Sequence, residues 1–515
     1  MKPKSREDST MADLAAATPI TAPPQADSVQ LATTQTIALA EVKTRREHDL
    51  LGEIDVPADA YWGVHTLRAV GNFPITGVPV GHFPEFVRAL ALVKQAAARA
   101  NRRLGNLPAA KADVIERACD LIAVDGRFHD QFVVDAVQGG AGTSTNMNAN
   151  EVIANVALEL MGKARGDYAA LHPNDDVNMA QSTNDAYPTA LRLAVIFATE
   201  PMIAALDELA FAFKAKAVEF ADVLKIGRTQ LQDAVPMTLG QEFDAFFATI
   251  KEDVSRLREA AALFREVNLG ATAIGTGITA DARYASLAIE ELARAARQPM
   301  VPATNLIEAT SDMGAFVLFS GVLKRVAVKL SKICNDLRLL SSGPRAGLSE
   351  IRLPAVQAGS SIMPGKVNPV IPEVVNQVAY LVIGHDLTVT LCAEGGQLQL
   401  NAFEPTIGYC LLSSLRHLTA AVTTLTTRCV TGIEADRERC LALVEDSIGL
   451  VTALGPTLGY EASSRVARRA LAEKRKVAEI VLEEGLLSRA ELDELLKIEA
   501  MTAPSRPKPA GKARA

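Results

Sequence analysis

The sequence predicts a mainly α-helical protein built around a bundle of long helices, and three observations support this. Between Phe316 and Leu340 apolar residues recur at alternating spacings of three and four, a heptad pattern typical of helices that pack lengthwise against one another. The same pattern runs from Phe243 to Phe264, and the stretch from Pro188 to Val223 contains no glycine. Patterns typical of β-strands are sparse, so we expect few strands.

Each heptad pattern defines an apolar seam along one helix. A helix from Leu239 to Glu266 would be about 40 Å long at a rise of roughly 1.5 Å per residue. Such a helix buries little surface by itself, so we expect the seams to be covered in a bundle, within one subunit or between subunits. The seam residues are Phe243, Phe247, Ile250, Val254, Leu257, Ala261 and Phe264 in one helix, and Phe316, Phe319, Leu323, Val326, Leu330, Ile333, Leu337 and Leu340 in the other.

The chain of 515 residues exceeds the ~250–300 residues at which a single hydrophobic core stops growing, so we expect two or three domains or one very elongated domain. The predicted division is an N-terminal domain at 46–185, a central helical bundle domain at 186–439 and a small helical C-terminal domain at 440–500. Residues 1–45 are rich in Ala, Thr, Pro and Gln, and residues 501–515 are rich in Pro, Lys and Ala. Both ends are therefore predicted to be disordered.

The composition excludes several classes of partner. Hydrophobic residues make up 49% and charged residues 22% of the chain, as in ordinary folded proteins. The formal net charge of −7 gives no general attraction to nucleic acid or to anionic lipid, so neither is expected to bind. No uncharged apolar run approaches the ~18 residues that a membrane span requires.

The cysteines and histidines carry further exclusions. The six cysteines form no C-x-x-C pair and mostly have apolar neighbours, which favours reduced, buried thiols in a cytoplasmic protein. The seven histidines form no H-E-x-x-H or H-x-H motif, so no metal site is predicted. The glycine-rich run at 139–142 lacks the lysine of a nucleotide-binding loop.

Four segments interrupt the helical pattern with small polar residues. They lie at 139–148, 178–185, 227–233 and 359–369. The first three each precede an expected helix, where hydroxyl and amide side chains serve as N-caps. Four clusters are more than capping requires, and such groups at helix N-termini also bind carboxylates. Together the clusters suit a small ligand with two negative charges.

The segment at 359–369 is the most specific of the four. Its glycines and prolines bracket Ser360, Ser361, Lys366 and Asn368. It could be a structural loop with incidental serines, or a mobile lid that carries a base or nucleophile beside a lysine. A hydrolase triad is not indicated, because the chain has no G-x-S-x-G motif and no histidine adjoins Ser360.

The run GSSIMPGKVNP at 359–369 resembles the signature of the fumarase, aspartase and argininosuccinate lyase superfamily, and matching segments extend from Asp49 to Leu496. Two segments resemble its aspartase branch, YWGVHTLRA at 61–69 and Ser-Thr-Asn at 182–184. Gln230 stands where fumarases have a histidine, and the absence of that histidine argues against hydratase chemistry. The resemblance implies an aspartate ammonia-lyase. Such an enzyme eliminates ammonia from L-aspartate, reversibly and in the anti sense, to give fumarate through an aci-carboxylate intermediate.

The resemblance also implies roles for individual residues. Ser360 would be the catalytic base, acting as an alkoxide. The C4 carboxylate takes up the charge of the intermediate, and its ligands would be Thr143, Ser182, Thr183 and Ser361. The C1 carboxylate would be bound by Lys366, Asn368 and Thr229, and the ammonium group by Asn184 with Thr143 and Gln230.

The assembly that the resemblance implies is a homotetramer in which three subunits build each active site, with the heptad seams in its central helical core. No cofactor is implied, and a divalent cation such as magnesium would serve only as an activator. Three alternatives stay open: a class II fumarate hydratase, an ammonia-lyase for a related amino acid such as 3-methylaspartate, and an inactive structural relative like the crystallins. Intact Ser360, Lys366 and Asn368 argue against the last.

Overall fold

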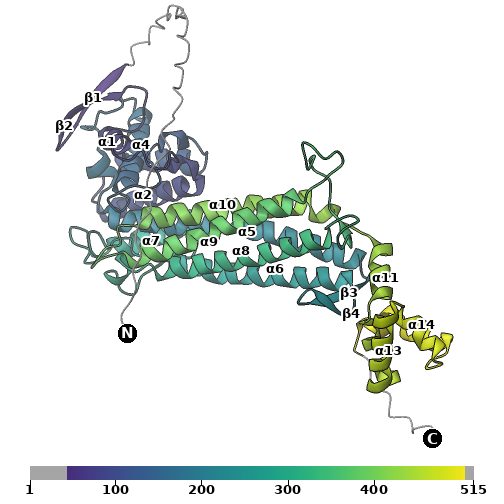
Figure 1. Cartoon of the computed structure of the whole chain (residues 1–515). Coiled ribbons are helices and arrows are strands. Elements are labelled where there is room, and N and C mark those ends of the chain that lie inside the picture. Colours follow the sequence, from purple (N-terminus) through teal and green to yellow (C-terminus); the bar gives the residue numbers. More distant parts are fainter. Residues whose placement is uncertain (1–42, 505–515) are drawn as a thin grey trace, which may run out of the picture. The chain divides into compact units, whose positions relative to one another are not determined.

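The computed structural model describes residues 43–504. Most of these residues lie in helices, as predicted (Figure 1), and residues 44–504 belong to one structural unit. All six cysteines are free thiols and five of them are buried, which also agrees with the prediction. The predicted disordered ends at 1–45 and 501–515 lie almost entirely outside the described residues.

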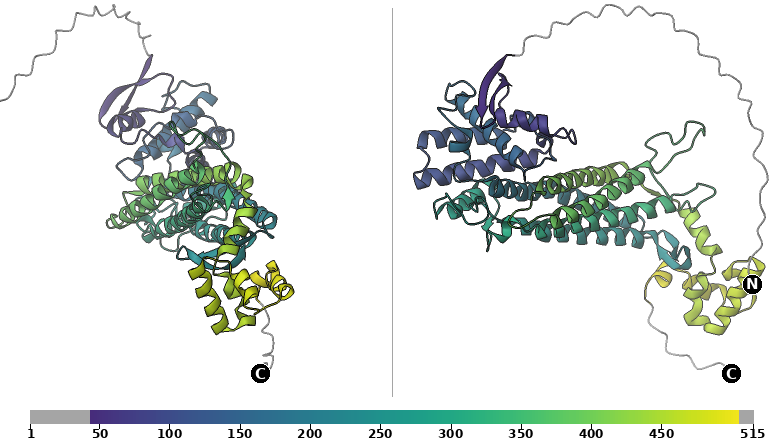
Figure 2. Two further views of the ribbon diagram at one scale, coloured as in Figure 1. Left: turned by 45° about the vertical axis from the view of Figure 1, so that its right-hand side comes forward. Right: turned by 60° about the vertical axis from the view of Figure 1, so that its left-hand side comes forward.

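The longest helices form a bundle in which each one lies against two others (Figures 1 and 2). They are α5 (Thr183–Glu219), α6 (Leu239–Ala261), α8 (Gly314–Leu340), α9 (Val370–Glu394) and α10 (Glu404–Arg428). α5 packs against α6 and α10, α8 packs against α6 and α9, and α9 packs against α10. Since α5, α8 and α10 run in one direction and α6 and α9 in the other (Figure 1), the start of α9 lies at the same end of the bundle as the end of α5.

The heptad seams are buried inside the chain. All eight seam residues of α8 are buried, and so are Phe243, Ile250 and Phe264 on the other seam. The ring of Phe264 lies 5.0 Å from that of Phe316, so the two seams meet each other. The expectation that they form the core between subunits is therefore wrong, because each long helix finds the cover for its seam within its own chain.

Leu330→Asp is accordingly expected to unfold the subunit itself. Leu330 is 0% exposed in the middle of α8, and an unpaired buried charge costs several kcal/mol. Thermal melting followed by circular dichroism should report a large loss of stability. Leu339→Asp is the matched control on the same helix, where the side chain is 41% exposed; a surface change of this kind typically costs about 0.5 kcal/mol or less. Equal melting temperatures for the two variants would contradict the assignment of the seam to the core.

α9 leaves an apolar face uncovered. Tyr380, Leu381, Leu387 and Leu391 are 54–62% exposed. Among the described helices, α5 and α9 are long and apolar enough by length and composition to cross a membrane. The most apolar stretch of α5 is 78% buried inside the protein, whereas that of α9 is only 33% buried. The core explains the apolar character of α5, whereas α9 presents a surface of the kind that marks an interaction site.

The region before α5 shares a hydrophobic core with the bundle. It contains the hairpin of β1 (Thr44–Asp49) and β2 (Gly52–Pro57) and four helices: α1 (Val64–Asn72), α2 (Pro84–Leu104), α3 (Ala109–Ala123) and α4 (Thr143–Leu160). α2 packs against both α5 and α3, and α4 packs against α3. Buried side chains from these helices and from the bundle form one continuous cluster.

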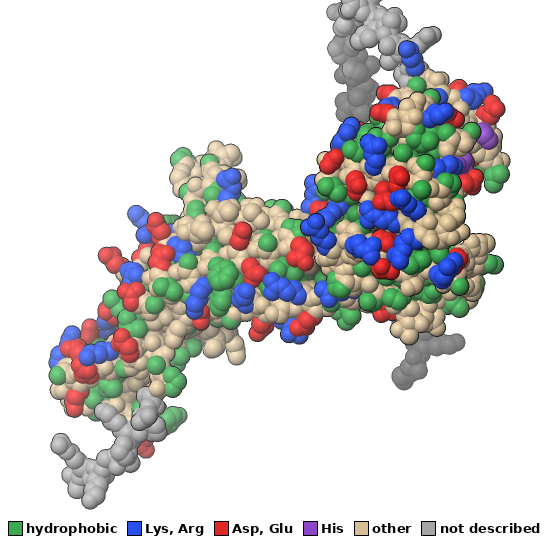
Figure 3. Space-filling view, turned by 180° about the vertical axis from the view of Figure 1, so that it is seen from behind, with side chains coloured by type: hydrophobic (Ala, Val, Ile, Leu, Met, Phe, Trp, Pro, Cys, Tyr) green, Lys and Arg blue, Asp and Glu red, His purple; other side chains and the backbone are tan. Residues whose placement is uncertain are grey.

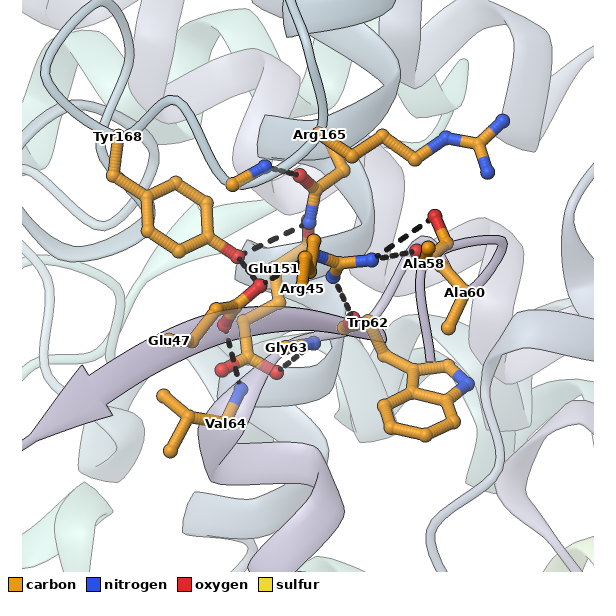
Figure 4. A network of polar contacts seen from close by, with 12 residues as sticks. Arg45, Glu47, Ala58, Ala60, Trp62, Gly63, Val64, Glu151, Arg165 and Tyr168 are labelled. Atoms are coloured by element: carbon orange, nitrogen blue, oxygen red, sulfur yellow. Dashed lines mark hydrogen bonds and ion pairs between the residues drawn. The ribbon is translucent and has the colours of Figure 1, made fainter. Parts of the chain in front are cut away.

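A buried polar network ties the β1–β2 hairpin to α1 and α4 (Figure 4). Arg45 donates to Glu47 Oε1 at 2.8 Å, and Glu47 Oε2 accepts the N–H of Val64 at 2.9 Å. Glu151 of α4 accepts the N–H of Gly63 at 2.8 Å. The two carboxylates thus satisfy N–H groups at the start of α1 that have no partner within the helix. Burial raises the pKa of Glu151 to about 7.

The remaining elements are short strands and smaller helices. The strands pair as β3 (Leu224–Thr229) with β4 (Gln232–Thr238), β5 (Glu266–Val267) with β6 (Val301–Pro302), and β7 (Ile351–Arg352) with β8 (Glu434–Ala435). The helices are α7 (Tyr284–Ala296), α11 (Arg437–Asp446), α12 (Leu450–Leu458), α13 (Tyr460–Glu473), α14 (Val477–Glu483), α15 (Arg489–Leu495) and α16 (Ile498–Thr502). Apolar residues from 444 onward form a second, smaller core that also takes in Ile226 of β3.

Acidic and basic side chains lie intermixed on the face that Figure 3 shows. Ion pairs between side chains of the described residues include Arg99–Glu116 at 2.7 Å and Arg294–Glu290 at 2.8 Å. Opposite charges that lie side by side largely cancel at a distance. An anionic ligand must therefore be held by groups close to it.

Candidate active site

The first two polar clusters meet at the starts of α4 and α5. Thr143 is the first residue of α4, Ser182 is the N-cap of α5, and Thr183 and Asn184 begin its first turn. Asn146 of α4 donates to Thr183 Oγ1 at 3.3 Å. The structure therefore brings together four of the predicted site residues from two separate segments.

Glycine is required where these two helix starts approach each other. Gly142, the N-cap of α4, has a φ of 89°, and a Cβ at this position would lie 2.3 Å from the ring of Tyr187. Any side chain here would push α4 away from α5. Gly142 thereby keeps Thr143 close to the first turn of α5.

The polar side chains of this group are partly engaged by the protein. Ser182 Oγ accepts the N–H of Asn184 at 3.3 Å, so the capping role considered for these residues is real for Ser182, and its O–H is left to donate. Thr143 Oγ1 donates to the carbonyl of Gly140 at 2.8 Å. The Asn184 amide donates to the carbonyl of Ala273 at 2.7 Å, which leaves its Oδ1 as an acceptor.

Lys94 contacts residues at the start of α4 and just before α5, and no sequence motif pointed to it. Its Nζ donates to Asn146 Oδ1 at 2.6 Å, to Asn178 Oδ1 at 2.9 Å and to Gln181 Oε1 at 2.9 Å. The side chain is fully buried, and burial lowers its pKa to about 7. One signal was present: Lys94 and the neighbouring Gln95 interrupt an otherwise apolar, alanine-rich stretch of α2.

Asp185 connects the start of α5 to the segment at 268–277. Its carboxylate accepts the N–H groups of Ser182 at 2.9 Å and of Gly270 and Thr272 at 3.0 Å each. Burial raises its pKa to about 6, although the three N–H donors and Lys94 oppose this shift. Asp185 therefore holds two features in place. One is Ser182, the N-cap of α5, and the other is the backbone next to Ala273, whose carbonyl accepts the Asn184 amide.

The third cluster forms a β-hairpin that leads into α6, which begins at Leu239 as expected, but the side chains of the cluster do not cap that helix. Thr229 ends β3 and pairs with Gln232 of β4, and Gln230 lies in the turn between them. The helix that follows is capped by Thr238, whose Oγ1 accepts the N–H of Gln241 at 3.1 Å. Thr229 and Gln230 are exposed at the tip of the hairpin.

The fourth cluster is a closed loop. The N–H of Gly359 donates to the carbonyl of Lys366 at 2.8 Å, and the Asn368 amide donates to the carbonyl of Gly359 at 2.7 Å. Within the loop, Ser360 Oγ accepts the N–H groups of Ile362 at 3.2 Å and Met363 at 3.1 Å. Ser360 is half-buried, whereas Ser361 and Lys366 are exposed. N–H groups that point at an oxygen stabilise its negatively charged form.

The length of α5 separates these groups. It has 37 residues and so spans about 55 Å, with Ser182 at its start and the β3–β4 hairpin after its end. Asn368 lines a small pocket with Cys429 after the end of α10, which lies at the far end of the bundle. One chain therefore holds its predicted site residues in two groups, too far apart to touch one small ligand.

A cavity of about 700 Å³ adjoins the loop at 359–369. Its lining includes Lys366, Asn368, Arg338, Arg352 and Glu373, so cationic groups predominate among its charged side chains. Another cavity, of about 540 Å³, is lined by His82, His129 and their neighbours and holds none of the predicted site residues. Within residues 43–504, no group of three or more His, Cys, Asp or Glu side chains is arranged to hold a metal ion.

Comparisons with known proteins match most of the chain to related lyases. The family model described as Lyase matches residues 52–384, and the model described as Fumarase C C-terminus matches residues 450–503. Aspartate ammonia-lyase of Pseudomonas aeruginosa is 64% identical over 90% of this chain and 97% of its own length.

Solved structures share the fold over the same extent. The crystal structure of fumarate lyase:delta crystallin from Brucella melitensis bound to cobalt is 61% identical, with a TM-score of 0.87, and covers 90% of this chain and 100% of its own. Class II fumarase from Schistosoma mansoni is 35% identical, with a TM-score of 0.84 over 90% of this chain and 100% of its own. With the signature loop, the long-helix bundle and these matches in agreement, the chain belongs to the aspartase/fumarase family of lyases.

Proposed function

We propose that this protein is an aspartate ammonia-lyase, which eliminates ammonia from L-aspartate to give fumarate, reversibly and in the anti sense. The observation that carries the proposal is the environment of Ser360. Its Oγ accepts two backbone N–H groups within a loop that also holds Lys366, in a chain closely related to an enzyme of this activity.

Ser360 is the base in the proposed mechanism. The C3 proton of aspartate is very weakly acidic, so its removal needs a strong base such as a serine alkoxide. The N–H groups of Ile362 and Met363 point at Ser360 Oγ and favour the ionised form, as does the positive charge of Lys366. Ser360 takes the C3 proton, and the electron pair of the C–H bond moves onto the C4 carboxylate to form the aci-carboxylate.

The C4 carboxylate is bound by hydroxyl groups that donate to it. Thr143, Ser182 and Thr183 supply this site from one chain, and Ser361 supplies it from the signature loop of another. Each hydrogen bond strengthens as charge develops, and one such donor in an enclosed site is worth about 3 kcal/mol. Lys366, Asn368 and Thr229 bind the C1 carboxylate, where charge-assisted hydrogen bonds fix the substrate.

The leaving group needs no separate acid. Asn184 Oδ1, left as an acceptor by the contact of its amide with Ala273, holds the ammonium group together with Thr143 and Gln230. When the aci-carboxylate collapses, the C–N bond breaks and neutral ammonia departs. Dehydration is different, because hydroxide must be protonated as it leaves, and Gln230 offers no ionisable proton for that step.

We further infer a homotetramer with active sites shared between subunits. Two observations support it: α5 keeps the two groups of site residues about 55 Å apart in one chain, and α9 presents an uncovered apolar face. In this proposal the subunits meet through the apolar face of α9, and not through the heptad seams that the sequence suggested. The site uses no cofactor, a divalent cation such as magnesium acts at most as an activator, and the free thiols suit a cytoplasmic location.

The test is a comparison of three substrates with the purified protein. Fumarate, followed by its ultraviolet absorbance, should form from L-aspartate together with one equivalent of ammonia, while L-malate should be left nearly untouched. 3-Methylaspartate is included as a third substrate, because it distinguishes a related ammonia-lyase. Faster turnover of malate than of aspartate would assign the protein to the fumarate hydratases instead.

A further inference from the structure

The β3–β4 hairpin, which carries Thr229 and Gln230, does not fix the conformation of its tip by backbone pairing alone. Gln230 and Leu231, the two residues of its turn, have φ angles of 54° and 63°. Residues other than glycine keep such left-handed angles only when their surroundings enforce them. The pairing of β3 with β4 also changes register between Ile226 and Arg228. The residues at the tip of the hairpin therefore do not continue the regular pairing at its base.

A buried group of charges lies at this break. The Glu350 side chain is 0% exposed, and its Oε1 is 2.8 Å from Arg228 Nη1. Its Oε2 is 3.1 Å from Lys225 Nζ, which is itself 2.6 Å from Glu242 Oε2. Two cations and two carboxylates therefore balance one another, and removal of one partner would leave an uncompensated charge in the interior.

Glu350 is held firmly by the bundle. Its N–H donates to the carbonyl of Leu340, the last residue of α8, at 2.9 Å, and its carbonyl accepts the N–H of Asp436 at 2.9 Å. These two backbone hydrogen bonds fix the position from which the Glu350 carboxylate binds Arg228. Arg228, which it binds, directly precedes Thr229 in the chain.

We propose that Glu350 is a positioning residue: through its ion pair with Arg228 it holds Thr229 where that side chain binds the C1 carboxylate of the substrate. The inference rests on the proposed function and places Glu350 itself outside contact with the substrate. It explains how exposed side chains on a strained turn can present a defined carboxylate site. A displacement of about 1 Å in such a site can cost up to 100-fold in activity.

The test compares Glu350→Gln with Thr229→Ala and with the double variant. Glu350→Gln should raise KM for L-aspartate about tenfold and leave kcat nearly unchanged, the signature of lost ground-state binding. In the Thr229→Ala background the same change should have no further effect on KM, because Glu350 acts through Thr229. Glu242→Gln is the matched control: it touches Lys225 but not Arg228, so KM should stay at the wild-type value.

Hydrogen exchange of the peptide 224–238, measured without substrate, reports on the hairpin independently of any activity. Exchange near Arg228 should be faster in Glu350→Gln than in wild type or in Glu242→Gln. If Glu350→Gln fails to fold, Arg228→Gln breaks the same ion pair from its less buried partner and should give the same results. Unchanged exchange, an unchanged KM, or KM effects that add in the double variant would each overturn the proposal. A wild-type protein without aspartate activity would refute the proposed function, and the exchange result would still decide whether Glu350 orders the hairpin.

Discussion

Ser360→Ala is expected to lower kcat for L-aspartate by several orders of magnitude while substrate binding survives. Removal of a general base typically costs ~10²–10⁴ in rate, and loss of the alkoxide adds to this. Ser360 lies in a loop rather than in the core, and its Oγ accepts only local N–H groups in the described structure. The melting temperature should therefore stay unchanged. Steady-state kinetics and a binding titration with aspartate measure the two effects separately.

Lys366→Ala provides the contrast on the same loop. It removes the cation that faces a carboxylate, so Kd for aspartate should rise as well as the rate fall. The two variants should thus differ in Kd more clearly than in rate. If Ser360→Ala kept more than about a tenth of the wild-type kcat, Ser360 would not be the base.

Two inactive variants are expected to restore each other's activity when they are co-expressed. Thr183→Ala damages the group at the start of α5, and Ser360→Ala damages the loop at the other end of the bundle, about 55 Å away along α5. If each site takes these groups from different subunits, random mixing leaves about a quarter of the sites with both groups intact. Activity should therefore recover from near zero to roughly that fraction of wild type.

The double variant that carries both changes, co-expressed with either single variant, is the control. In neither mixture can a site combine an intact Thr183 with an intact Ser360, so activity should stay near zero. Purification through different tags on the two chains ensures that mixed oligomers are measured. Mixed oligomers of Thr183→Ala and Ser360→Ala that remain inactive would show that a site draws both groups from one chain.

Several features of the fold were predictable because they depend on local pattern. The heptad spacing from Phe316 to Leu340 predicted α8, which runs from Gly314 to Leu340. Ser182 was expected at a helix start and is the N-cap of α5. In contrast, the segment at 227–233 suggested caps for the helix that follows, but it forms a hairpin and Thr238 caps that helix instead, because small polar residues suit turns and caps equally well.

Lys94 illustrates a different limit. A lysine inside an apolar helix stretch is a visible anomaly, yet its partners Asn146, Asn178 and Gln181 come from segments 52–87 residues further along the chain. Spacing within α2 carries no information about them. Glu350 and Arg228 are likewise 122 residues apart, so their ion pair exists only in the folded protein.

The sequence by itself determined the helical class, the long bundle helices, the signature loop around Ser360 and the family, since periodicity and short motifs act over a few turns of chain. Only the tertiary structure decided what covers each apolar face and which site residues meet. Spacing shows that the residues of a seam share one side of a helix, but it does not specify which chain covers them. The fold buried both seams within one chain, left the face of α9 open, and placed Thr183 and Ser360 at opposite ends of the bundle.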